Sequence, residues 1–338
     1  MSFTIIGTGS AYPACSKTNE ELSLLIDTSD EWISTRTGIK SRHISTTETL
    51  CDFAAEAAAR ALKDASTAAE ELDLIICSTA RGDHVTPSLA CEIQQRLGAV
   101  CPAFDLNAAC TGFVYALDVA FSYFSARRAK KILIVSAEAM SRLLDWQDRS
   151  TCVLFGDGAG AAVLAPGDSL LSIKIGAKGE VAPLYVENTR GNCPYSQIRQ
   201  VDPYLKMNGK DVYKFAVAAM CGDLAEVIRE AGLTQADVDF VLPHQANLRI
   251  IDAAKSKLSI APEKYRHNIE RFGNTSSASI PILLDELNRA GELHAGNILA
   301  LTAFGGGMTT GACVLRWGQK DGSIKKKAGM IDDKNTTV

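Results

Sequence analysis

One succession of elements occurs twice in this sequence, at a constant distance along the chain. A helical pattern is followed by a strand pattern that begins at Leu72, and the same succession returns with a strand pattern that begins at Val238. Leu72 and Val238 lie 166 positions apart, and so do Ile132 and Ile298, which begin two later apolar segments. An equal offset at two separate places indicates an internal duplication. Two copies predict two fused half-domains and not a solenoid.

Short apolar segments alternate with longer helical ones along the whole chain. This alternation is typical of an α/β domain whose strands are buried between layers of helices. We expect a first half at 1–170, a second half at 171–317 and a polar tail at 318–338. The tail holds Lys325–Lys327, and its composition is typical of a solvated, disordered segment.

Composition and charge exclude several classes of protein. With 338 residues, of which 46% are hydrophobic and 22% charged, the chain can bury a sizeable core. The net charge of −4 gives no large basic surface for nucleic acid. The longest apolar runs are about 4 to 7 residues, far short of the roughly 18 to 20 that cross a membrane. Because the N-terminus also lacks a secretory signal, we expect a cytoplasmic protein without nucleic-acid or membrane partners.

Ten cysteines would suggest disulfides in a small secreted protein, but this chain is long and has no export signal. We therefore expect mostly free thiols. No CxxC or Cys/His ligand spacing is present, so no metal site is predicted. Cys77, Cys91, Cys152 and Cys313 lie in apolar or helical runs, where a thiol behaves as a small hydrophobic group.

Cys110 differs from the other nine because it falls where a short extended segment, 101–106, meets a helix. Val114, Leu117 and Phe121 recur after it at helical spacing. A thiol at a helix start is close to the positive end of the helix dipole and to unpaired amides, which lower its pKa. The pattern predicts a nucleophilic thiolate. The alternative is a small buried residue among alanines.

His244 ends the strand pattern 238–242 and precedes a helical segment. The carboxyl edge of a buried strand is where α/β proteins usually bind ligands, and histidine is the side chain that exchanges protons near neutral pH. This position favours a site residue. A purely structural histidine is the alternative.

Two further segments could stabilise a developing oxyanion. Asn274, in 273–279, carries an amide that can donate a hydrogen bond, although its small hydroxyl-bearing neighbours also suit a helix cap. The glycines at 305–307 permit a close backbone approach, either for an N–H donor or simply for a tight turn. The glycine-rich run 156–160 lacks the early strand–turn–helix context of a dinucleotide loop, so we do not expect nucleotide binding there.

Taken together, four segments resemble the β-ketoacyl-[acyl-carrier-protein] synthase III family over residues 1–317: AACTGF with Cys110, PHQAN with His244, GNTSSASIP with Asn274, and AFGGG. The resemblance implies a thiolase-like fold, with two duplicated halves that form a five-layered αβαβα core, and a homodimer. It implies an acyltransferase that condenses an acyl-CoA primer with malonyl-[acyl-carrier protein] and so initiates fatty acid biosynthesis. The acyl group passes through Cys110, and neither a metal nor a redox cofactor is implied.

The resemblance also implies roles for individual residues. His244 and Asn274 would donate hydrogen bonds to the malonyl thioester carbonyl, and the backbone N–H groups of Cys110 and Gly306 would form the oxyanion hole. Trp32 and Arg149 would sandwich the adenine of CoA. The full CoA-binding set would be Thr28, Trp32, Arg36, Arg149 and Asn247, and a basic group near the entrance, for an acidic carrier protein, would be Lys214, Arg249, Lys255 and Lys257.

The sequence departs from the family pattern at the acyl pocket. Thr86 stands where the family often has a bulky Phe, which is contributed across the dimer to close that pocket. Because Thr is smaller, we expect the pocket to admit primers longer or more branched than acetyl. Met308 and the threonines after it replace a commoner aromatic-containing sequence, and the tail beyond Trp317 is extra.

Other enzymes share this fold or this order of residues. A biosynthetic thiolase needs a second cysteine in a glycine-rich loop, but Cys313 lies in a strand-like run. Chalcone-synthase-like enzymes are longer and have a different glycine loop, and papain-like hydrolases carry the cysteine near the mature N-terminus in another motif. A non-catalytic acyl-binding protein would lack one of the three site residues. The main alternative is a paralogue of secondary metabolism that uses another acceptor or a longer acyl donor.

Overall fold

The computed structural model describes residues 2–188, 193–198 and 201–318. Except for Gly318, the tail predicted at 318–338 lies outside these ranges, so its disorder stays a prediction.

Two β-sheets form the frame of the molecule. The strand order of the first sheet is β1-β7-β6-β4-β5, and that of the second is β11-β12-β13-β8. Strand β4 pairs in parallel with β5 and β6, and β11 pairs in parallel with β12, whereas the other neighbours are antiparallel. The strands are β1 (Ser2–Ala11), β4 (Leu74–Ser78), β5 (Ala103–Leu106), β6 (Ile132–Ala139), β7 (Asp157–Gly167), β8 (Leu170–Glu180), β11 (Phe240–Pro243), β12 (Ile298–Gly305) and β13 (Gly307–Arg316).

The second sheet repeats the first. Its order β8-β13-β12-β11 corresponds to β1-β7-β6-β4, and the starts of β4 and β11, Leu74 and Phe240, are again 166 positions apart. The starts of β6 and β12 have the same offset. The predicted duplication within the fold is therefore confirmed. The division of the chain at 1–170 and 171–317 remains a proposal; β7, of the first sheet, ends at Gly167, and β8, of the second, begins at Leu170.

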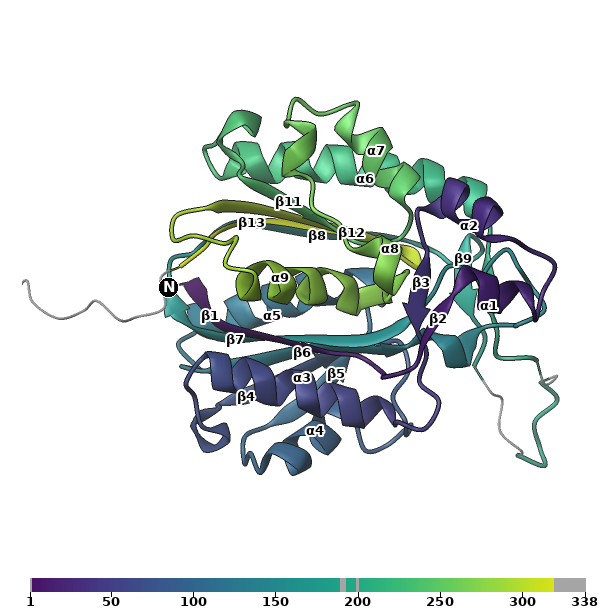
Figure 1. Cartoon of the computed structure of the whole chain (residues 1–338). Helices are drawn as coiled ribbons and strands as arrows, with labels where there is room; N and C mark the ends of the chain where they lie inside the picture. Colours follow the sequence, from purple (N-terminus) through teal and green to yellow (C-terminus); the bar gives the residue numbers. More distant parts are fainter. Residues whose placement is uncertain (1, 189–192, 199–200, 319–338) are drawn as a thin grey trace, which may run out of the picture.

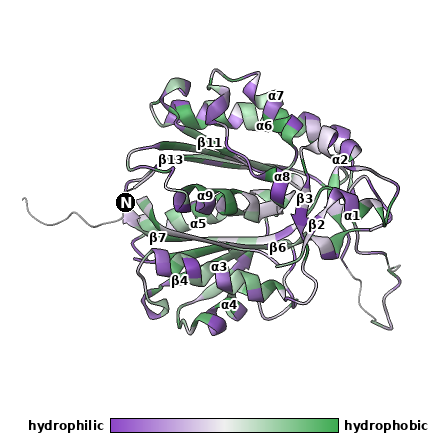
Figure 2. Cartoon of the chain, in the orientation of Figure 1, coloured by the Kyte–Doolittle hydropathy of each residue, from purple (hydrophilic) through white to green (hydrophobic). Residues whose placement is uncertain are grey.

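Helices form three layers around the two sheets, giving the predicted order αβαβα (Figure 1). Helices α3 (Leu50–Asp64) and α4 (Leu89–Leu97) cover the outer face of the first sheet, and α6 (Gly209–Glu230) and α7 (Leu248–Lys255) cover that of the second. Helices α5 (Gly112–Ser125) and α9 (Ser279–Arg289) lie between the sheets. Their apolar side chains pack on both sheets in one central core (Figure 2).

The central strands are buried on both faces. All eight residues of β6 and all eight of β12 are buried. Strands covered on both sides read as continuous apolar runs, which is why 132–135 and 298–301 were recognisable in the sequence. Among the described residues, no helix combines the length and apolar character needed to cross a membrane.

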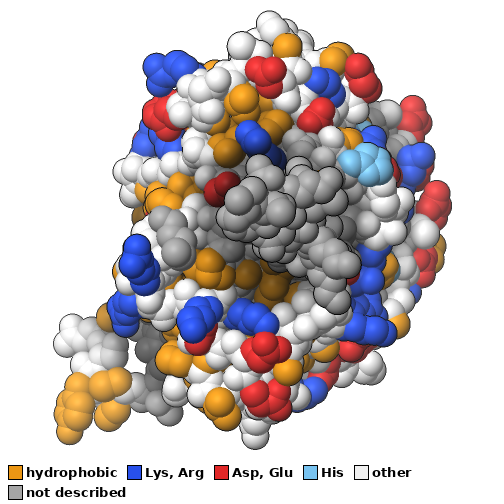
Figure 3. Space-filling model, turned by 90° about the vertical axis from the view of Figure 1, so that its left-hand side faces the viewer, with side chains coloured by type: hydrophobic (Ala, Val, Ile, Leu, Met, Phe, Trp, Pro, Cys, Tyr) orange, Lys and Arg blue, Asp and Glu red, His pale blue; other side chains and the backbone are white. Residues whose placement is uncertain are grey.

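Smaller elements gather at the end of the layers away from the N-terminus (Figure 1). They include α1 (Asn19–Ser23), α2 (Asp30–Thr37), α8 (Ile269–Phe272), β2 (Ser16–Thr18), β3 (Ser41–His43), β9 (Leu184–Val186) and β10 (Leu205–Met207). The opposite end, which carries the N-terminus, has acidic and basic side chains interspersed over its surface (Figure 3).

Candidate active site

A cavity of about 670 Å³ lies where the two halves of the chain meet. The structure brings together in its lining residues that are far apart in the sequence: Cys110, His244, Asn274, Phe304, Gly305 and Gly306. The three side chains and the glycine loop singled out in the sequence therefore share one site.

Cys110 lies in a short 3₁₀ turn, Ala109–Thr111, between β5 and α5. The thiol is buried, and the Ser276 hydroxyl donates a hydrogen bond to its Sγ at 3.4 Å. Burial raises the pKa of the Cys110 thiol to about 12, although the Ser276 hydrogen bond opposes the rise. The predicted position at a helix start is correct. The predicted lowering of the pKa is wrong, because desolvation of the thiolate outweighs the groups that favour it.

His244 follows β11 and is fully enclosed. Its Nδ1 lies 2.7 Å from Ser279 Oγ, and the backbone N–H of Gln245 donates to the same oxygen at 3.3 Å. Burial lowers the pKa of His244 to about 3, so the ring is neutral at pH 7. Because Ser279 Oγ accepts from Gln245, its own hydrogen is available to Nδ1. When the Ser279 hydrogen is donated to Nδ1, the ring hydrogen is on Nε2.

Asn274 is held by its own backbone and by one side-chain contact. Its N–H donates to the Leu154 carbonyl at 2.8 Å, and its carbonyl accepts from the Gly156 N–H at 3.1 Å. Its Oδ1 accepts from the Ser276 N–H at 2.8 Å, an Asx-type contact at the turn before α9. The capping interpretation is thus partly correct. The same contact makes the Nδ2 group the donor left for the cavity.

The glycine loop connects β12 to β13 beside the nucleophile turn. A Cβ added at Gly305 would lie 2.8 Å from the Cys110 nitrogen, and one at Gly306 would lie 3.5 Å from the Ala109 Cβ. No ordinary side chain tolerates a contact as short as the first. The close backbone approach that the sequence allowed is therefore used at Gly305.

Three site residues escaped sequence reasoning. In the sequence, Ser276 and Ser279 belong to a run of small residues, and Glu138 is part of no motif. Glu138, on β6, is buried, and its Oε1 accepts hydrogen bonds from Ser277 Oγ at 2.7 Å and Ser276 Oγ at 3.1 Å. The signal that could have found it is an acidic residue inside an otherwise uncharged, largely apolar strand.

Comparison with known proteins agrees with this geometry. The family model described as 3-oxoacyl-[acyl-carrier-protein (ACP)] synthase III matches residues 104–179, and the model of its C-terminal part matches 228–317. A relative from Clostridium acetobutylicum named beta-ketoacyl-[acyl-carrier-protein] synthase III is 46% identical over 321 residues, which cover 94% of this chain and 99% of the relative. This chain belongs to the β-ketoacyl-[acyl-carrier-protein] synthase III family.

Solved structures give the same result for the fold. The crystal structure of 3-oxoacyl-[acyl-carrier-protein] synthase III from Aquifex aeolicus has a TM-score of 0.87 and 44% identity, covering 93% of this chain and 99% of that one. The priming β-ketosynthase of the R1128 polyketide pathway has a TM-score of 0.88 and 36% identity, covering 94% and 97%. The predicted thiolase-like fold of this synthase III family member is confirmed.

A second hollow of about 440 Å³ adjoins the cavity, and Leu154, Met207, Tyr213 and Asn247 line both. Trp32 and Arg36 lie on its wall. The two hollows together give this synthase III family member a route from the surface towards Cys110.

Two arginines lie against Trp32, the residue that the resemblance places beside the adenine. The Arg36 guanidinium carbon is 4.6 Å from the ring centre and that of Arg149 is 5.3 Å from it, while Arg149 also donates to the Asp27 carbonyl at 2.7 Å. A base held between two planar groups contacts each of them at about 3.5 Å, so the two groups must be about 7 Å apart. The present distance between Arg149 and Trp32 is shorter. A base between Trp32 and Arg149, as the resemblance implies, would require Arg149 to move outward. Thr28 lines neither hollow, and its buried hydroxyl has no hydrogen-bond partner within the described part of the chain.

The four basic residues expected near the entrance have different surroundings. Arg249, on α7, lines the second hollow, whereas Lys255 forms an ion pair with Asp252 at 3.1 Å. Lys214, on α6, and Lys257, after α7, are exposed. Only Arg249 of these four lines the entrance directly.

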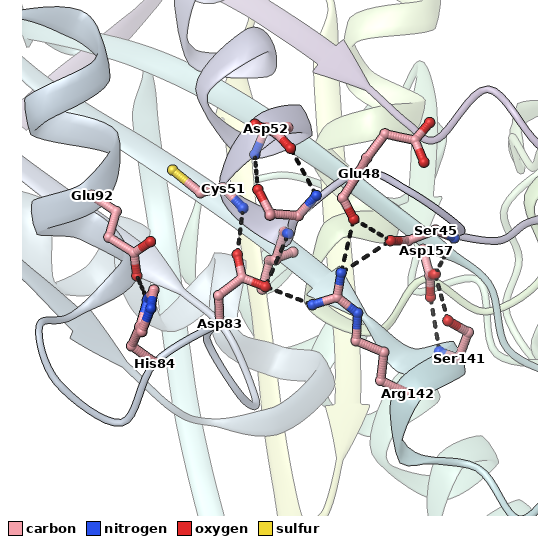
Figure 4. A network of polar contacts seen from close by, with 12 residues as sticks. Ser45, Glu48, Cys51, Asp52, Asp83, His84, Glu92, Ser141, Arg142 and Asp157 are labelled. Atoms are coloured by element: carbon pink, nitrogen blue, oxygen red, sulfur yellow. Dashed lines mark hydrogen bonds and ion pairs between the residues drawn. The ribbon is translucent and has the colours of Figure 1, made fainter.

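A network of polar contacts fixes the segment that carries Thr86 (Figure 4). The carboxylate of Asp83 accepts from the backbone N–H groups of Leu50 and Cys51, at 3.1 and 2.9 Å, and from Arg142 at 2.5 Å. Val85 lines the cavity, but Thr86 is exposed and does not. A role of Thr86 in an acyl pocket therefore requires a second subunit.

All ten cysteines are free thiols, so Cys110 has no disulfide partner. Within residues 2–188, 193–198 and 201–318, no group of three or more His, Cys, Asp or Glu side chains is placed to hold a metal ion. The expectation that no cofactor is used stays a prediction.

Proposed function

We propose that this chain condenses an acyl-CoA primer with malonyl-[acyl-carrier protein] to give a 3-oxoacyl-[acyl-carrier protein], the step that starts fatty acid biosynthesis. The observation that carries the proposal is that a thiol, a neutral imidazole and an oriented amide, Cys110, His244 and Asn274, line one cavity. Membership of the synthase III family supports the same reaction.

The first half-reaction is acyl transfer to Cys110. The sulfur attacks the thioester carbonyl carbon, a new C–S bond forms, and the bond to the CoA sulfur breaks. The oxygen of the tetrahedral species carries negative charge, which the backbone N–H groups of Cys110 and Gly306 would hold. The close approach of the glycine loop to the Cys110 nitrogen supports this assignment.

The second half-reaction is decarboxylation of the malonyl thioester. As carbon dioxide leaves, charge develops on the thioester oxygen, and the His244 Nε2–H and the Asn274 amide would donate to it. A neutral imidazole suits this task because it is a donor that does not give up its proton to the enolate. Loss of one such donor typically costs about 2.7–4 kcal/mol of transition-state stabilisation. The enolate carbon then attacks the acyl group on Cys110 and releases the sulfur.

The substrates would enter through the second hollow. CoA would contact the set Thr28, Trp32, Arg36, Arg149 and Asn247, and the carrier protein would meet Lys214, Arg249, Lys255 and Lys257. The hollow beside Trp32 supports the CoA assignment, and the position of Arg249 supports the carrier-protein assignment. Catalysis would need neither a metal nor a redox cofactor, and the location would be the cytoplasm.

A homodimer would complete the acyl pocket, with Thr86 reaching the cavity of the partner subunit. The exposed position of Thr86 beside Val85, which is fully exposed, supports a contact outside its own subunit. Turnover with acetyl-, isobutyryl- and octanoyl-CoA tests the predicted acceptance of larger primers. Strict preference for acetyl-CoA would contradict it.

The alternative is a paralogue that serves another acceptor. The 36% identity to a priming β-ketosynthase of a polyketide pathway supports this alternative. It predicts the same acylation of Cys110 but slow release of carbon dioxide from malonyl-[acyl-carrier protein] of fatty acid synthesis.

One experiment tests the proposed reaction. The protein is incubated with acyl-CoA, the acylated peptide is located by mass spectrometry, and malonyl-[acyl-carrier protein] is then added. We expect Cys110→Ser to lose acyl transfer and His244→Ala to accept the acyl group but fail to decarboxylate. Acylation at another residue, or no carbon dioxide release from the native protein, would refute the assignment.

A further inference from the structure

The buried thiol of Cys110 needs a group that takes its proton. A thiol whose pKa is about 12 is ionised to about one part in 10⁵ at pH 7. His244 is poorly suited to the task, because burial lowers its pKa to about 3 and its Nδ1 is engaged by Ser279. A base must therefore be sought elsewhere around the sulfur.

A hydrogen-bonded path leads from the sulfur to a carboxylate. Ser276 Oγ lies 3.4 Å from Cys110 Sγ and 3.1 Å from Glu138 Oε1. All three residues are buried, and Cys110 and Ser276 also line the cavity. Because the Ser276 hydroxyl has one hydrogen and two lone pairs, it donates either to Cys110 Sγ or to Glu138 Oε1. When it donates to the carboxylate, it can accept the hydrogen of the thiol.

We propose that Glu138 is the general base of acyl transfer and takes the proton of Cys110 through Ser276. The inference rests on the proposed function in one respect, namely that Cys110 is the nucleophile. Glu138 does not line the cavity, whereas Ser276 does, so the carboxylate would act through the hydroxyl of Ser276.

The proton and electron balance of the step is simple. As the Cys110 sulfur bonds to the thioester carbon, its proton passes to Ser276 Oγ and the Ser276 proton passes to Glu138 Oε1. No free thiolate accumulates. When the tetrahedral species collapses, the CoA sulfur leaves with the electrons of its C–S bond. Glu138 then gives its proton to Ser276, and the Ser276 proton passes to the CoA sulfur as it leaves beside Cys110. The products are the CoA thiol, the acylated Cys110 and the restored Glu138 carboxylate.

The surroundings of Glu138 suit a base that works near neutral pH. Burial raises its pKa to about 7, against the hydrogen bonds from Ser277 and from the Ala80 N–H at 3.0 Å. A catalytic base is most effective when its pKa is near the working pH. Cys77 on β4 and Cys110 are the ionisable neighbours whose pKa the charge of Glu138 raises.

A purely structural role would also explain these bonds, because Glu138 ties the segment at Ala80 to the turn at 276–278. The two roles differ in what they predict for pH. Loss of a structural contact would slow both half-reactions. Loss of a base would slow only the reactions of the Cys110 sulfur, and the rate of those reactions would no longer follow the ionisation of Glu138.

The test measures alkylation of Cys110 by iodoacetamide between pH 5.5 and 9.5, with mass spectrometry to count only that site. In the native protein we expect the rate to rise with a midpoint near pH 7. Glu138→Gln and Ser276→Ala should each lower the rate at pH 7.5 by about 100-fold, within the usual range for general-base catalysis, and abolish that midpoint. Ser276→Ala keeps the hydrogen bonds of Glu138 to Ser277 and Ala80, so it still tests the path if Glu138→Gln does not fold.

Ser277→Ala is the matched control, because Ser277 bonds to Glu138 but Cys110 bonds to Ser276. It removes a donor to the carboxylate, so the midpoint should move to higher pH while the rate at high pH is kept. A native-like rate and midpoint in both Glu138→Gln and Ser276→Ala would overturn the proposal.

A second measurement separates a base from a structural tie. In a Cys110→Ala background, decarboxylation of malonyl thioester does not use the sulfur. Adding Glu138→Gln to this background should reduce the rate of decarboxylation no more than about threefold, whereas the alkylation rate falls about 100-fold. Equal losses in the two rates would overturn the proposal. Because alkylation needs no acyl-CoA, failure of the relay and failure of the proposed condensation are distinguishable.

Discussion

His244 and Glu138 are both buried, and burial moves their pKa values in directions that have opposite effects on stability. The pKa of His244 falls from 6.5 to about 3, and that of Glu138 rises from 4.5 to about 7. Between pH 4.5 and 6.5 the unfolded chain therefore holds a proton on His244 that the folded chain lacks. In the same interval the folded chain holds a proton on Glu138 that the unfolded chain has lost.

The signs follow from proton linkage. The contribution of His244 is present above pH 6.5 and is lost as the pH falls towards 3, because protonation favours the unfolded chain. The contribution of Glu138 is present below pH 4.5 and is lost as the pH rises towards 7. Each slope is about 1.4 kcal/mol per pH unit. In the native protein the two slopes of the unfolding free energy cancel between pH 4.5 and 6.5. Replacing either His244 or Glu138 leaves the slope of the remaining residue measurable.

Denaturant unfolding at fixed protein concentration, measured from pH 4.5 to 6.5, tests this cancellation. Relative to the native protein, His244→Gln should lose about 3 kcal/mol more at pH 6.5 than at pH 4.5. Glu138→Gln should show the reverse, a deficit that is larger by about 3 kcal/mol at pH 4.5. Taking differences from the native protein removes the contributions of all other groups. Differences that do not vary with pH would refute the buried, shifted state of the group concerned.

Three further substitutions probe the site geometry. Ser279→Ala removes the partner of His244 Nδ1, so the ring hydrogen can move to Nδ1. Loss of this hydrogen bond, worth about 1 kcal/mol, should slow malonyl decarboxylation several-fold and leave acyl transfer unchanged. Ser279→Thr keeps the hydroxyl and should restore decarboxylation. Gly305→Ala places a methyl group 2.8 Å from the Cys110 nitrogen, so single-turnover acylation should fall by at least tenfold, and a native rate would contradict the predicted oxyanion hole. Arg149→Ala should raise the KM for acyl-CoA by roughly three- to tenfold, the loss of a contact worth about 1 kcal/mol, with little change in kcat; an unchanged KM would exclude the contact with CoA.

Periodicity and offset were sufficient for the architecture because they report burial along strands. The 166-residue offset carried over to β4 and β11 even though both strands begin two residues later than Leu72 and Val238. The helical pattern that precedes Val238 is the last part of the longer α6, because the first turns of α6 have exposed polar side chains that weaken the apolar pattern.

The chemistry of the site was harder to predict, because pKa values depend on packing across the two halves. Cys110 was correctly placed at a helix start, but its burial comes in part from residues such as Ser276, on the other half of the chain. Local patterns left structural alternatives open for His244 and Asn274. Only their joint resemblance to a family united them. Glu138 was hidden because a single acidic residue does not disturb the apolar character of β6.

The duplication also explains why the site needs both halves. The 3₁₀ turns Ala109–Thr111 and Ser276–Ala278 precede the two central helices, and each begins with a residue of positive φ, Ala109 at 49° and Ser276 at 50°. The two turns are equivalent in the duplication but carry different chemistry. The first turn supplies the thiol, and the second supplies the hydroxyls that reach Cys110 and Glu138.

Since Cys110 and Glu138 lie in the first half and Ser276 in the second, neither half holds the complete path between sulfur and carboxylate. His244 and Asn274 also belong to the second half of the chain. Acyl transfer therefore depends mainly on residues of the first half, and decarboxylation depends mainly on residues of the second. A chain divided near residue 170 should therefore regain alkylation of Cys110 with a midpoint near pH 7 only when both fragments reassociate. If the first fragment alone reproduced that pH profile, the pathway through Ser276 would be wrong.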